Sequence, residues 1–113
     1  MNLKGVKLTW LGHSTFRIET PGGKTIFIDP WIMGNPMCPE ADKKVKKADV
    51  LLCTHGHGDH IGDAVEVVKQ HDPIVVGIYE LCLWMAKTMK GRGRKHDRHG
   101  QLLPNDLHAE IKL

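Results

Sequence analysis

The segment THGHGDH, residues 54–60, concentrates metal-binding side chains near the middle of the chain. His55, His57, Asp59 and His60 fall within six residues in the pattern HxHxDH, with glycine at two of the intervening positions. Imidazole and carboxylate groups suit zinc, manganese or iron, and the chain has no CxxC pair to supply thiolates. One histidine in a glycine-rich turn usually has no special role, but this combination predicts a metal site.

Hydrophobic segments on both sides place the cluster at the end of a strand. A continuous apolar run in DVLLCT (49–54) predicts a strand buried on both faces. The helical spacing of Ile61, Ala64, Val65 and Val68 in IGDAVEVVKQH predicts an amphipathic helix that begins near Asp59. The cluster then occupies the turn at the C-terminal end of a strand, where open α/β sheets bind ligands.

The glycines have a predicted role in this turn. Gly56 and Gly58 are expected to allow backbone angles closed to other residues, so that the turn is sharp and the imidazoles converge. His55 and His57 would then face one ion, and Asp59 and His60 a second ion beside it. A bound metal lowers the pKa of water from ~15.7 to ~7, which predicts a hydroxide nucleophile for hydrolysis.

The rest of the chain reads as one α/β domain. VKLTWLG, STFRIET and KTIFIDP predict three strands within the first thirty residues, arranged as an antiparallel meander, with PGG as a turn. WIMGNPMCPE reads as a loop, and PIVVGIY as another buried strand. The last predicted helix is ELCLWMAKTMK, with a core-facing stripe of four residues: Leu81, Trp84, Met85 and Thr88.

Composition excludes several classes of protein. The chain has 113 residues, 41% hydrophobic and 26% charged, which suits one globular domain, and no apolar run approaches the ~20 residues of a membrane span. The N-terminus lacks signal-peptide features, so a cytoplasmic location is expected. Of three cysteines, Cys53 and Cys82 are predicted to be buried thiols, whereas Cys38 lies in a predicted loop where it can be exposed.

Two basic clusters, residues 42–47 and 90–99, contribute to a net charge of +3. The lysines at 42–47 are predicted to form a solvated face. Binding of nucleic acid by the cluster at 90–99 is the rival interpretation, which is disfavoured because no aromatic residue follows Trp84 to stack on bases. The expected partner is a small-molecule substrate, with no membrane, and a homo-oligomer stays open as an alternative.

The pattern HxHxDH after a hydrophobic strand resembles the signature of the metallo-β-lactamase superfamily. The stretches LTWLGHSTFRIET, TIFIDPWIMGNP and THGHGDHIGDAVEV are similar to a branch of metal-dependent hydrolases related to the ascorbate-phosphate lactonases. The resemblance runs from about Val6 to about Lys90. It implies an αββα sandwich, of which residues 1–90 form the N-terminal half.

The resemblance also implies roles for individual residues. His55 and His57 would bind one divalent ion and Asp59 and His60 a second, most often zinc, with manganese as the alternative. Asp59 would also manage the proton of the metal-bound hydroxide, which makes it the predicted catalytic residue. His13 would line the pocket, and Asp29 would orient a ligand residue by a hydrogen bond without touching the metal. The alternative for each is a structural role only: a histidine in a turn for His13, and a turn that ends a strand for Asp29.

Residues 91–113 depart from the family pattern and read as a divergent basic tail. The resemblance implies a second half that supplies further ligands and the other sheet, and a shifted reading frame after Lys90 is one hypothesis for its absence. The leading functional prediction is a metal-dependent hydrolase that attacks a small ester, lactone or phosphorylated substrate with a metal-bridging hydroxide. The alternative is a truncated, inactive metal-binding remnant or an oligomerising half-domain.

Overall fold

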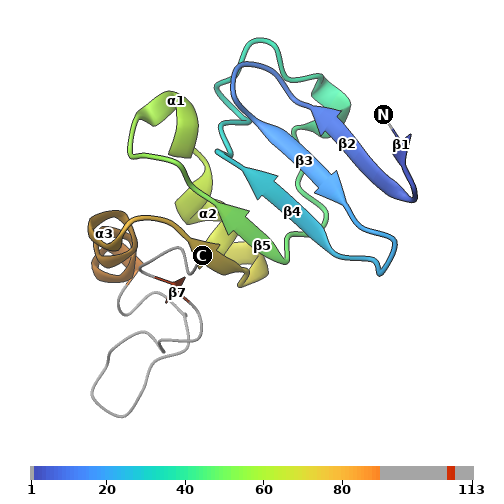
Figure 1. Cartoon of the computed structure of the whole chain (residues 1–113). Coiled ribbons are helices and arrows are strands. Elements are labelled where there is room, and N and C mark those ends of the chain that lie inside the picture. Colours follow the sequence, from blue (N-terminus) through green and yellow to red (C-terminus); the bar gives the residue numbers. More distant parts are fainter. Residues whose placement is uncertain (1, 90–106, 109–113) are drawn as a thin grey trace.

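The computed structural model of the chain describes residues 2–89 and 107–108 (Figure 1). The strands are β1 (Asn2–Leu3), β2 (Val6–Trp10), β3 (Phe16–Glu19), β4 (Thr25–Ile28), β5 (Val50–Leu52), β6 (Ile74–Val76) and β7 (Leu107–His108). The helices are the 3-10 helix η1 (Glu40–Asp42) and the α-helices α1 (Gly58–Ile61), α2 (Ala64–His71) and α3 (Tyr79–Met89).

The strands form one mixed sheet in sequence order. β1 to β4 pair antiparallel, which confirms the predicted meander, and β4 to β7 pair parallel. α1 and α2 lie between β5 and β6, and α3 follows β6. Buried side chains of α2 and α3 join those of the sheet in one core cluster. The predicted α/β class is confirmed, as one sheet with helices on one face.

The core lies between the sheet and these helices. Phe27, Leu51 and Val75 lie opposite one another on neighbouring strands and are at most 2% exposed. The helices cover this row with six buried side chains: Ala64, Val67 and Val68 of α2, and Leu81, Cys82 and Met85 of α3. Each large apolar side chain buried in this way contributes about 1.5–3 kcal/mol to the folded state.

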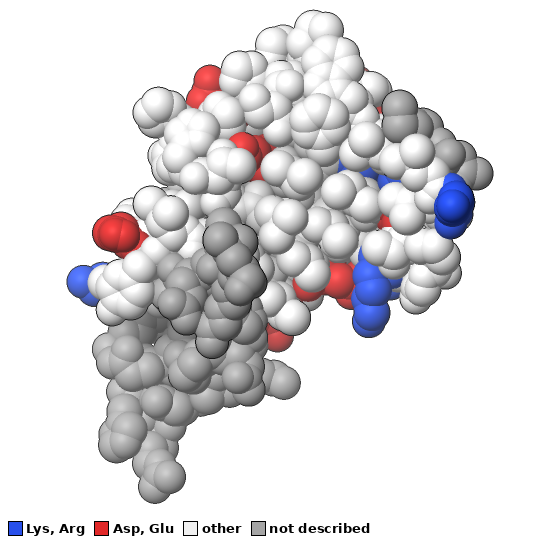
Figure 2. Space-filling model, in the orientation of Figure 1, with Lys and Arg blue, Asp and Glu red and all other residues white. Residues whose placement is uncertain are grey.

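The opposite face of the sheet carries two rows of apolar side chains that the described residues leave open. One cross-strand row is Leu8, Ile18, Ile26, Val50 and Ile74, and the next is Trp10, Phe16, Ile28, Leu52 and Val76. All ten side chains are half-buried or exposed. Figure 2 shows this face as mostly free of charged side chains. We call these ten residues the open face.

The open face corrects the prediction that the strands at 49–54 and 73–79 are buried on both sides. Leu51 and Val75 are fully buried, but Leu52 and Val76 are only half-buried, and Ile74 is 44% exposed. A continuous apolar run is typical of a strand that is covered on both faces of its sheet. The residues that the structure describes cover only one of them.

The loop between β4 and β5 is fixed by a buried amide. Asn35 Nδ2 donates to the carbonyl oxygens of Gly12 and Trp31, both at 3.0 Å, and Asn35 Oδ1 accepts from the backbone N–H of Met37. The Cys38 N–H donates to the Asn35 carbonyl and turns the chain inward. Cys38 is therefore 5% exposed, which corrects the prediction of an exposed thiol, and burial raises its pKa. Cys53 and Cys82 are buried as predicted.

The single helix predicted to begin near Asp59 is interrupted at Gly62 and Asp63. A Cβ at Gly62 would lie 2.8 Å from Trp31 Cδ1 and 2.7 Å from the Gly58 carbonyl oxygen. The Asp63 N–H donates to the Pro30 carbonyl, and its carboxylate accepts from the backbone N–H groups of Ile32 and Met33. The break thus lets the loop after β4 pack directly against α1 and α2.

The predicted stripe on α3 is only partly right. Leu81 and Met85 are buried, but Trp84 is 48% exposed. The buried arc of α3 runs through Leu81, Cys82 and Met85, and Trp84 falls outside it. Helical spacing places Trp84 one turn after Leu81, on the same side of the helix. The side of α3 that faces the core is centred closer to Cys82, so Trp84 lies beyond its edge.

Side chains of the basic cluster at 42–47 contact both neighbouring and distant parts of the chain. Lys43 Nζ donates to the Met33 carbonyl at 3.1 Å, and Lys47 Nζ lies 3.5 Å from Asp49 Oδ2. Among the described residues, no helix is long and apolar enough to cross a membrane. The predicted boundary between residues 1–90 and the tail 91–113 lies outside the described residues, as does the tail apart from 107–108. The division into these two parts stays a prediction.

Two glycine variants test the helix break. Gly62→Ala should lower the free energy of unfolding by about 1–3 kcal/mol, because the new methyl group collides with Trp31. Gly58→Ala is the matched control, since a Cβ there meets nothing within 4 Å; it should be neutral or stabilising by up to about 1 kcal/mol. Urea denaturation of the metal-free protein measures both, and equal effects would refute the packing argument.

Candidate metal centre

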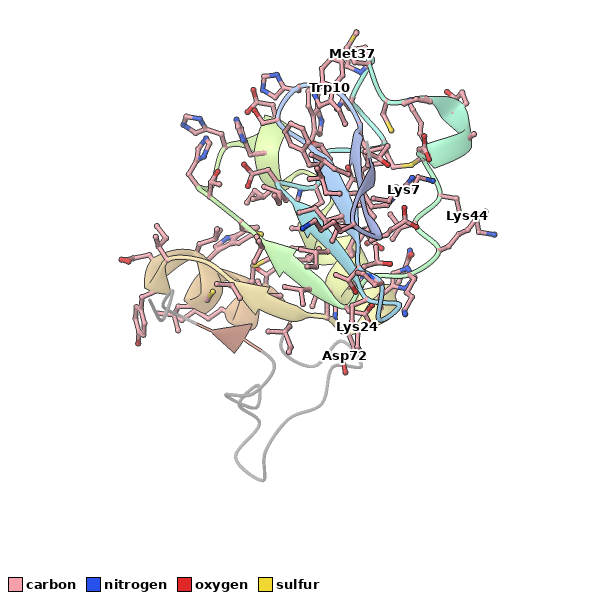
Figure 3. All side chains as sticks on the ribbon, turned by 45° about the vertical axis from the view of Figure 1, so that its right-hand side comes forward. Lys7, Trp10, Lys24, Met37, Lys44 and Asp72 are labelled. Carbon is pink, nitrogen blue, oxygen red and sulfur yellow. The ribbon has the colours of Figure 1, made fainter. Side chains whose placement is uncertain are left out.

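Three separate segments meet at one edge of the sheet. His13 lies in the turn between β2 and β3, Asp29 directly follows β4, and residues 54–60 follow β5. The pairings of Phe16 with Ile28 and of Ile28 with Leu52 hold these strand ends side by side. In Figure 3, Trp10 and Met37 mark this end of the molecule, and Lys24 and Asp72 mark the other.

Asp29 is the centre of a buried hydrogen-bond network. Its residue is 2% exposed, and Oδ1 accepts from the Thr54 N–H at 2.7 Å. Oδ2 lies 2.6 Å from the Thr54 hydroxyl and 2.9 Å from His60 Nδ1. Both carboxylate oxygens are thereby occupied by groups from the segment after β5. The predicted orienting carboxylate does contact a predicted ligand.

This network determines which ring nitrogen each imidazole presents. An ionised carboxylate only accepts, so His60 Nδ1 donates to Asp29 and the Thr54 hydroxyl donates to Asp29 as well. The hydroxyl has one hydrogen, so His55 Nδ1, 2.8 Å from Thr54 Oγ1, must be the donor in that contact. In the neutral imidazole that binds a metal, these contacts place the proton of His55 and of His60 on Nδ1, so that Nε2 is the nitrogen each ring offers. Metal-ligating histidines are commonly oriented in this way.

A second group of ligand atoms surrounds Asp59. Its Oδ2 lies 3.0 Å from His13 Nε2, and its Oδ1 lies 3.7 Å from His60 Nε2. The rings of His13 and His60 make an edge contact with centroids 5.2 Å apart. His13, Asp59 and His60 offer ligand atoms within 4.8 Å of one another, and so do Asp29, His55 and His60.

His57 is the predicted ligand that stands apart from these groups. Its ring centroid is 4.6 Å from that of His55 and 6.5 Å from that of His60. The side chain is exposed, and neither three-residue group among the described residues includes it. His55 and His57 are therefore adjacent, as the spacing predicts, but their pairing on one ion stays a prediction.

Cys53 precedes the cluster but does not supply a thiolate. Burial, reinforced by the negative charge of Asp29, raises the pKa of the Cys53 thiol to about 12. The thiol is then neutral near pH 7, and a thiol must lose its proton to bind a metal. The donors at this edge are imidazole and carboxylate groups, which fit a divalent ion of the zinc or manganese type.

The expected role of the two turn glycines is wrong. Neither Gly56 nor Gly58 has a positive φ, whereas Gly5, Gly12 and Gly23 do. Positive φ falls instead on His13 (54°) and Asp29 (47°), where it is uncommon. Around Gly58, a Cβ would meet nothing within 4 Å. At Gly56 a Cβ would make only an ordinary contact, 3.9 Å from Leu81 Cδ1, so neither position requires glycine for its φ or for space.

Sequence reasoning missed two residues that build the site. Thr54 links Asp29 to His55, and the fully buried Thr15 hydroxyl donates to the Asp29 carbonyl at 2.7 Å. Both lie beside residues that the sequence did single out. A threonine next to a ligand histidine is the available signal, but threonine is common at strand ends, so the signal is weak.

Comparisons with known proteins show the family to which the chain belongs. A family model described as the beta-lactamase superfamily domain matches residues 7–104. A UPF0173 metal-dependent hydrolase of Koribacter versatilis is 63% identical over 87 residues, which cover 77% of this chain and 37% of that protein. Another, from Solibacter usitatus, is 41% identical over 109 residues, which cover 92% of this chain and 47% of that protein.

A solved structure shows the same relationship. Igni18, described as a novel metallo hydrolase from the hyperthermophilic archaeon Ignicoccus hospitalis, superimposes with a TM-score of 0.60 at 38% identity. The match covers 76% of this chain and 36% of Igni18. The chain thus spans less than half the length of these three relatives. The resemblance noted from HxHxDH is confirmed: the chain belongs to the beta-lactamase superfamily, among relatives named as metal-dependent hydrolases.

Proposed function

We propose that this chain carries the metal-binding part of a hydrolase that acts on a small ester, lactone or phosphorylated substrate. The observation that carries the proposal is the Asp29 network, which leaves Nε2 of His55 and of His60 free on one edge of the sheet. The names of the relatives support the reaction class but not a substrate.

Each residue of the proposed metal site would have its own role. When bound, a divalent ion supplies an activated water and polarises the bond to be cleaved. His55, His57, Asp59 and His60 would hold the two ions proposed for this family. Asp29 would fix the ring of His60 from the buried side, and Thr54 that of His55. The Asp59 carboxylate, which is 47% exposed, would also accept a proton at the open side of the site.

Activity tests the proposal directly. The chain loaded with Zn²⁺ or Mn²⁺ should hydrolyse activated aryl esters or phosphodiesters, and His57→Ala or Asp59→Ala should reduce the rate by about 100-fold or more, since metal binding depends on each ligand. His71→Ala is the control, because His71 ends α2 and its Nε2 contacts the Val45 carbonyl. A rate that survives chelation or both ligand variants would contradict the proposal.

The tautomer argument makes a separate prediction about metal affinity. Thr54→Val removes the hydroxyl that accepts from His55 Nδ1, so His55 can protonate on Nε2 and lose its ligand atom. Zn²⁺ affinity should fall by about 10–100-fold. Thr54→Ser keeps the hydroxyl and should stay within a few-fold of the unmodified chain. Competition with a fluorescent chelator measures the Kd, and equal values for Val and Ser would refute the relay through Thr54.

A second candidate function, an oligomerising half-domain, is favoured by the open face. Ten apolar side chains in two adjacent rows form a surface that soluble monomers rarely expose. We propose that, in a 113-residue polypeptide of this sequence, a second copy covers these rows. Two sheets packed face to face at about 10 Å would bury the side chains that the helices leave open.

Light scattering after size exclusion tests this association. The 113-residue polypeptide should elute as a dimer or larger species at micromolar concentration. Ile26→Lys places a charge in the middle of the open face and should shift the population to monomer. Gln70→Lys, at an exposed position of α2, is the control and should change nothing. A monomeric unmodified polypeptide would contradict the proposal.

A further inference from the structure

His13 occupies a position that its surroundings hold in a costly conformation. It has φ = 54°, which non-glycine residues seldom adopt, and it follows Gly12, which has φ = 102°. Trp10 Nε1 donates to the His13 carbonyl at 2.9 Å, and the Thr15 N–H donates to the Gly12 carbonyl at 3.0 Å. Strain of this kind persists where the neighbouring structure enforces it, and it often marks a functional site.

The strained turn aims the His13 ring at the metal-binding edge. The ring packs edge-on against Trp31, with centroids 5.5 Å apart, and against His60. Its Nε2 lies 3.0 Å from Asp59 Oδ2. Because an ionised carboxylate only accepts, Nε2 is the donor in this contact, and a metal ion bound there would displace its proton. Trp31 in turn lies against Gly62, so the wall behind His13 is fixed by the same contact that interrupts the helix after α1.

The distances around Asp59 suit a common ion. Ligand atoms placed tetrahedrally at about 2.0–2.2 Å from zinc are roughly 3.3–3.6 Å apart. His13 Nε2 lies 3.0 Å from Asp59 Oδ2, and His60 Nε2 lies 3.7 Å from Asp59 Oδ1, so the two imidazoles approach different oxygens of one carboxylate. One ligand atom from each of the three residues lies within 4.8 Å of the others. His60 Nε2 is the free nitrogen of its ring, because Nδ1 is bonded to Asp29.

The competing group, Asp29 with His55 and His60, is less suited to hold an ion. Both Asp29 oxygens already accept hydrogen bonds from Thr54 and His60, and Asp29 is 2% exposed. An ion there would have to displace these bonds in a buried place. Asp59, in contrast, is 47% exposed at its side chain and has its oxygens turned toward His13 and His60.

We propose that His13 is a metal ligand, and that His13, Asp59 and His60 form a three-ligand site for one divalent ion within this chain. The inference rests on the proposed function in that it takes Asp59 and His60 as ligands of the second ion. It adds a third protein ligand from the β2–β3 turn. Two imidazoles and one carboxylate with an open position are the donor set of many catalytic zinc sites.

Metal titration with two His13 variants tests the proposal. In His13→Gln the side-chain amide can still donate to Asp59 but is a poor metal ligand, and His13→Asn tolerates positive φ well and guards against misfolding. Both should weaken Zn²⁺ binding by about 100-fold and reduce the intense visible absorption that four-coordinate Co²⁺ gives. His71→Gln is the matched control and should leave both readouts unchanged.

The outcomes separate this inference from the proposed function. If His60→Ala weakens Zn²⁺ binding but His13→Gln and His13→Asn do not, the proposed function stands and His13 is not a ligand. If the unmodified chain binds neither Zn²⁺ nor Co²⁺, both proposals fall. If His13→Asn keeps the circular dichroism of the unmodified chain and loses the ion, His13 is a ligand.

Discussion

One buried carboxylate joins the two halves of the described structure. Asp29 ends the meander, and its two oxygens bind the backbone and hydroxyl of Thr54 and the ring of His60 in the segment after β5. The ends of β4 and β5 are therefore tied together by side chains as well as by the sheet. A buried charge is costly unless it is satisfied by hydrogen bonds, so this network must be complete for the fold to tolerate Asp29. The completeness of the network fixes the geometry of the histidines.

Periodicity and motif spacing predicted much of the fold and the place of the site. The meander, the parallel strands and the cluster HxHxDH at a strand end are all in the structure, because alternation of apolar residues and turn residues are local signals. The residues that hold the cluster in place were not predicted. Thr15, Asn35 and Thr54 act through hydrogen bonds to carbonyls and carboxylates that lie close only after folding.

The errors have a common physical origin. The strand at Val50–Leu52 has the composition of a strand that is buried on both faces. Composition does not show whether a second layer of structure packs on the other face. The break at Gly62 follows from the indole of Trp31, thirty-one positions earlier, and no helical pattern contains that contact. Cys38 is buried because Asn35 turns its loop inward. At Gly62 and Cys38 a tertiary contact overrides a local preference, and at Val50–Leu52 the described residues lack the contact that the local preference suits.

The second row of the open face ends where the metal centre begins. Ile28 directly precedes Asp29, Leu52 lies two residues before Thr54, and Trp10 donates to the backbone of His13. Whatever sheet or subunit removes this row from water also forms one wall of the centre. Electrostatic interactions strengthen as water leaves a site. Covering this row and lowering the dielectric around the ligands are therefore one event.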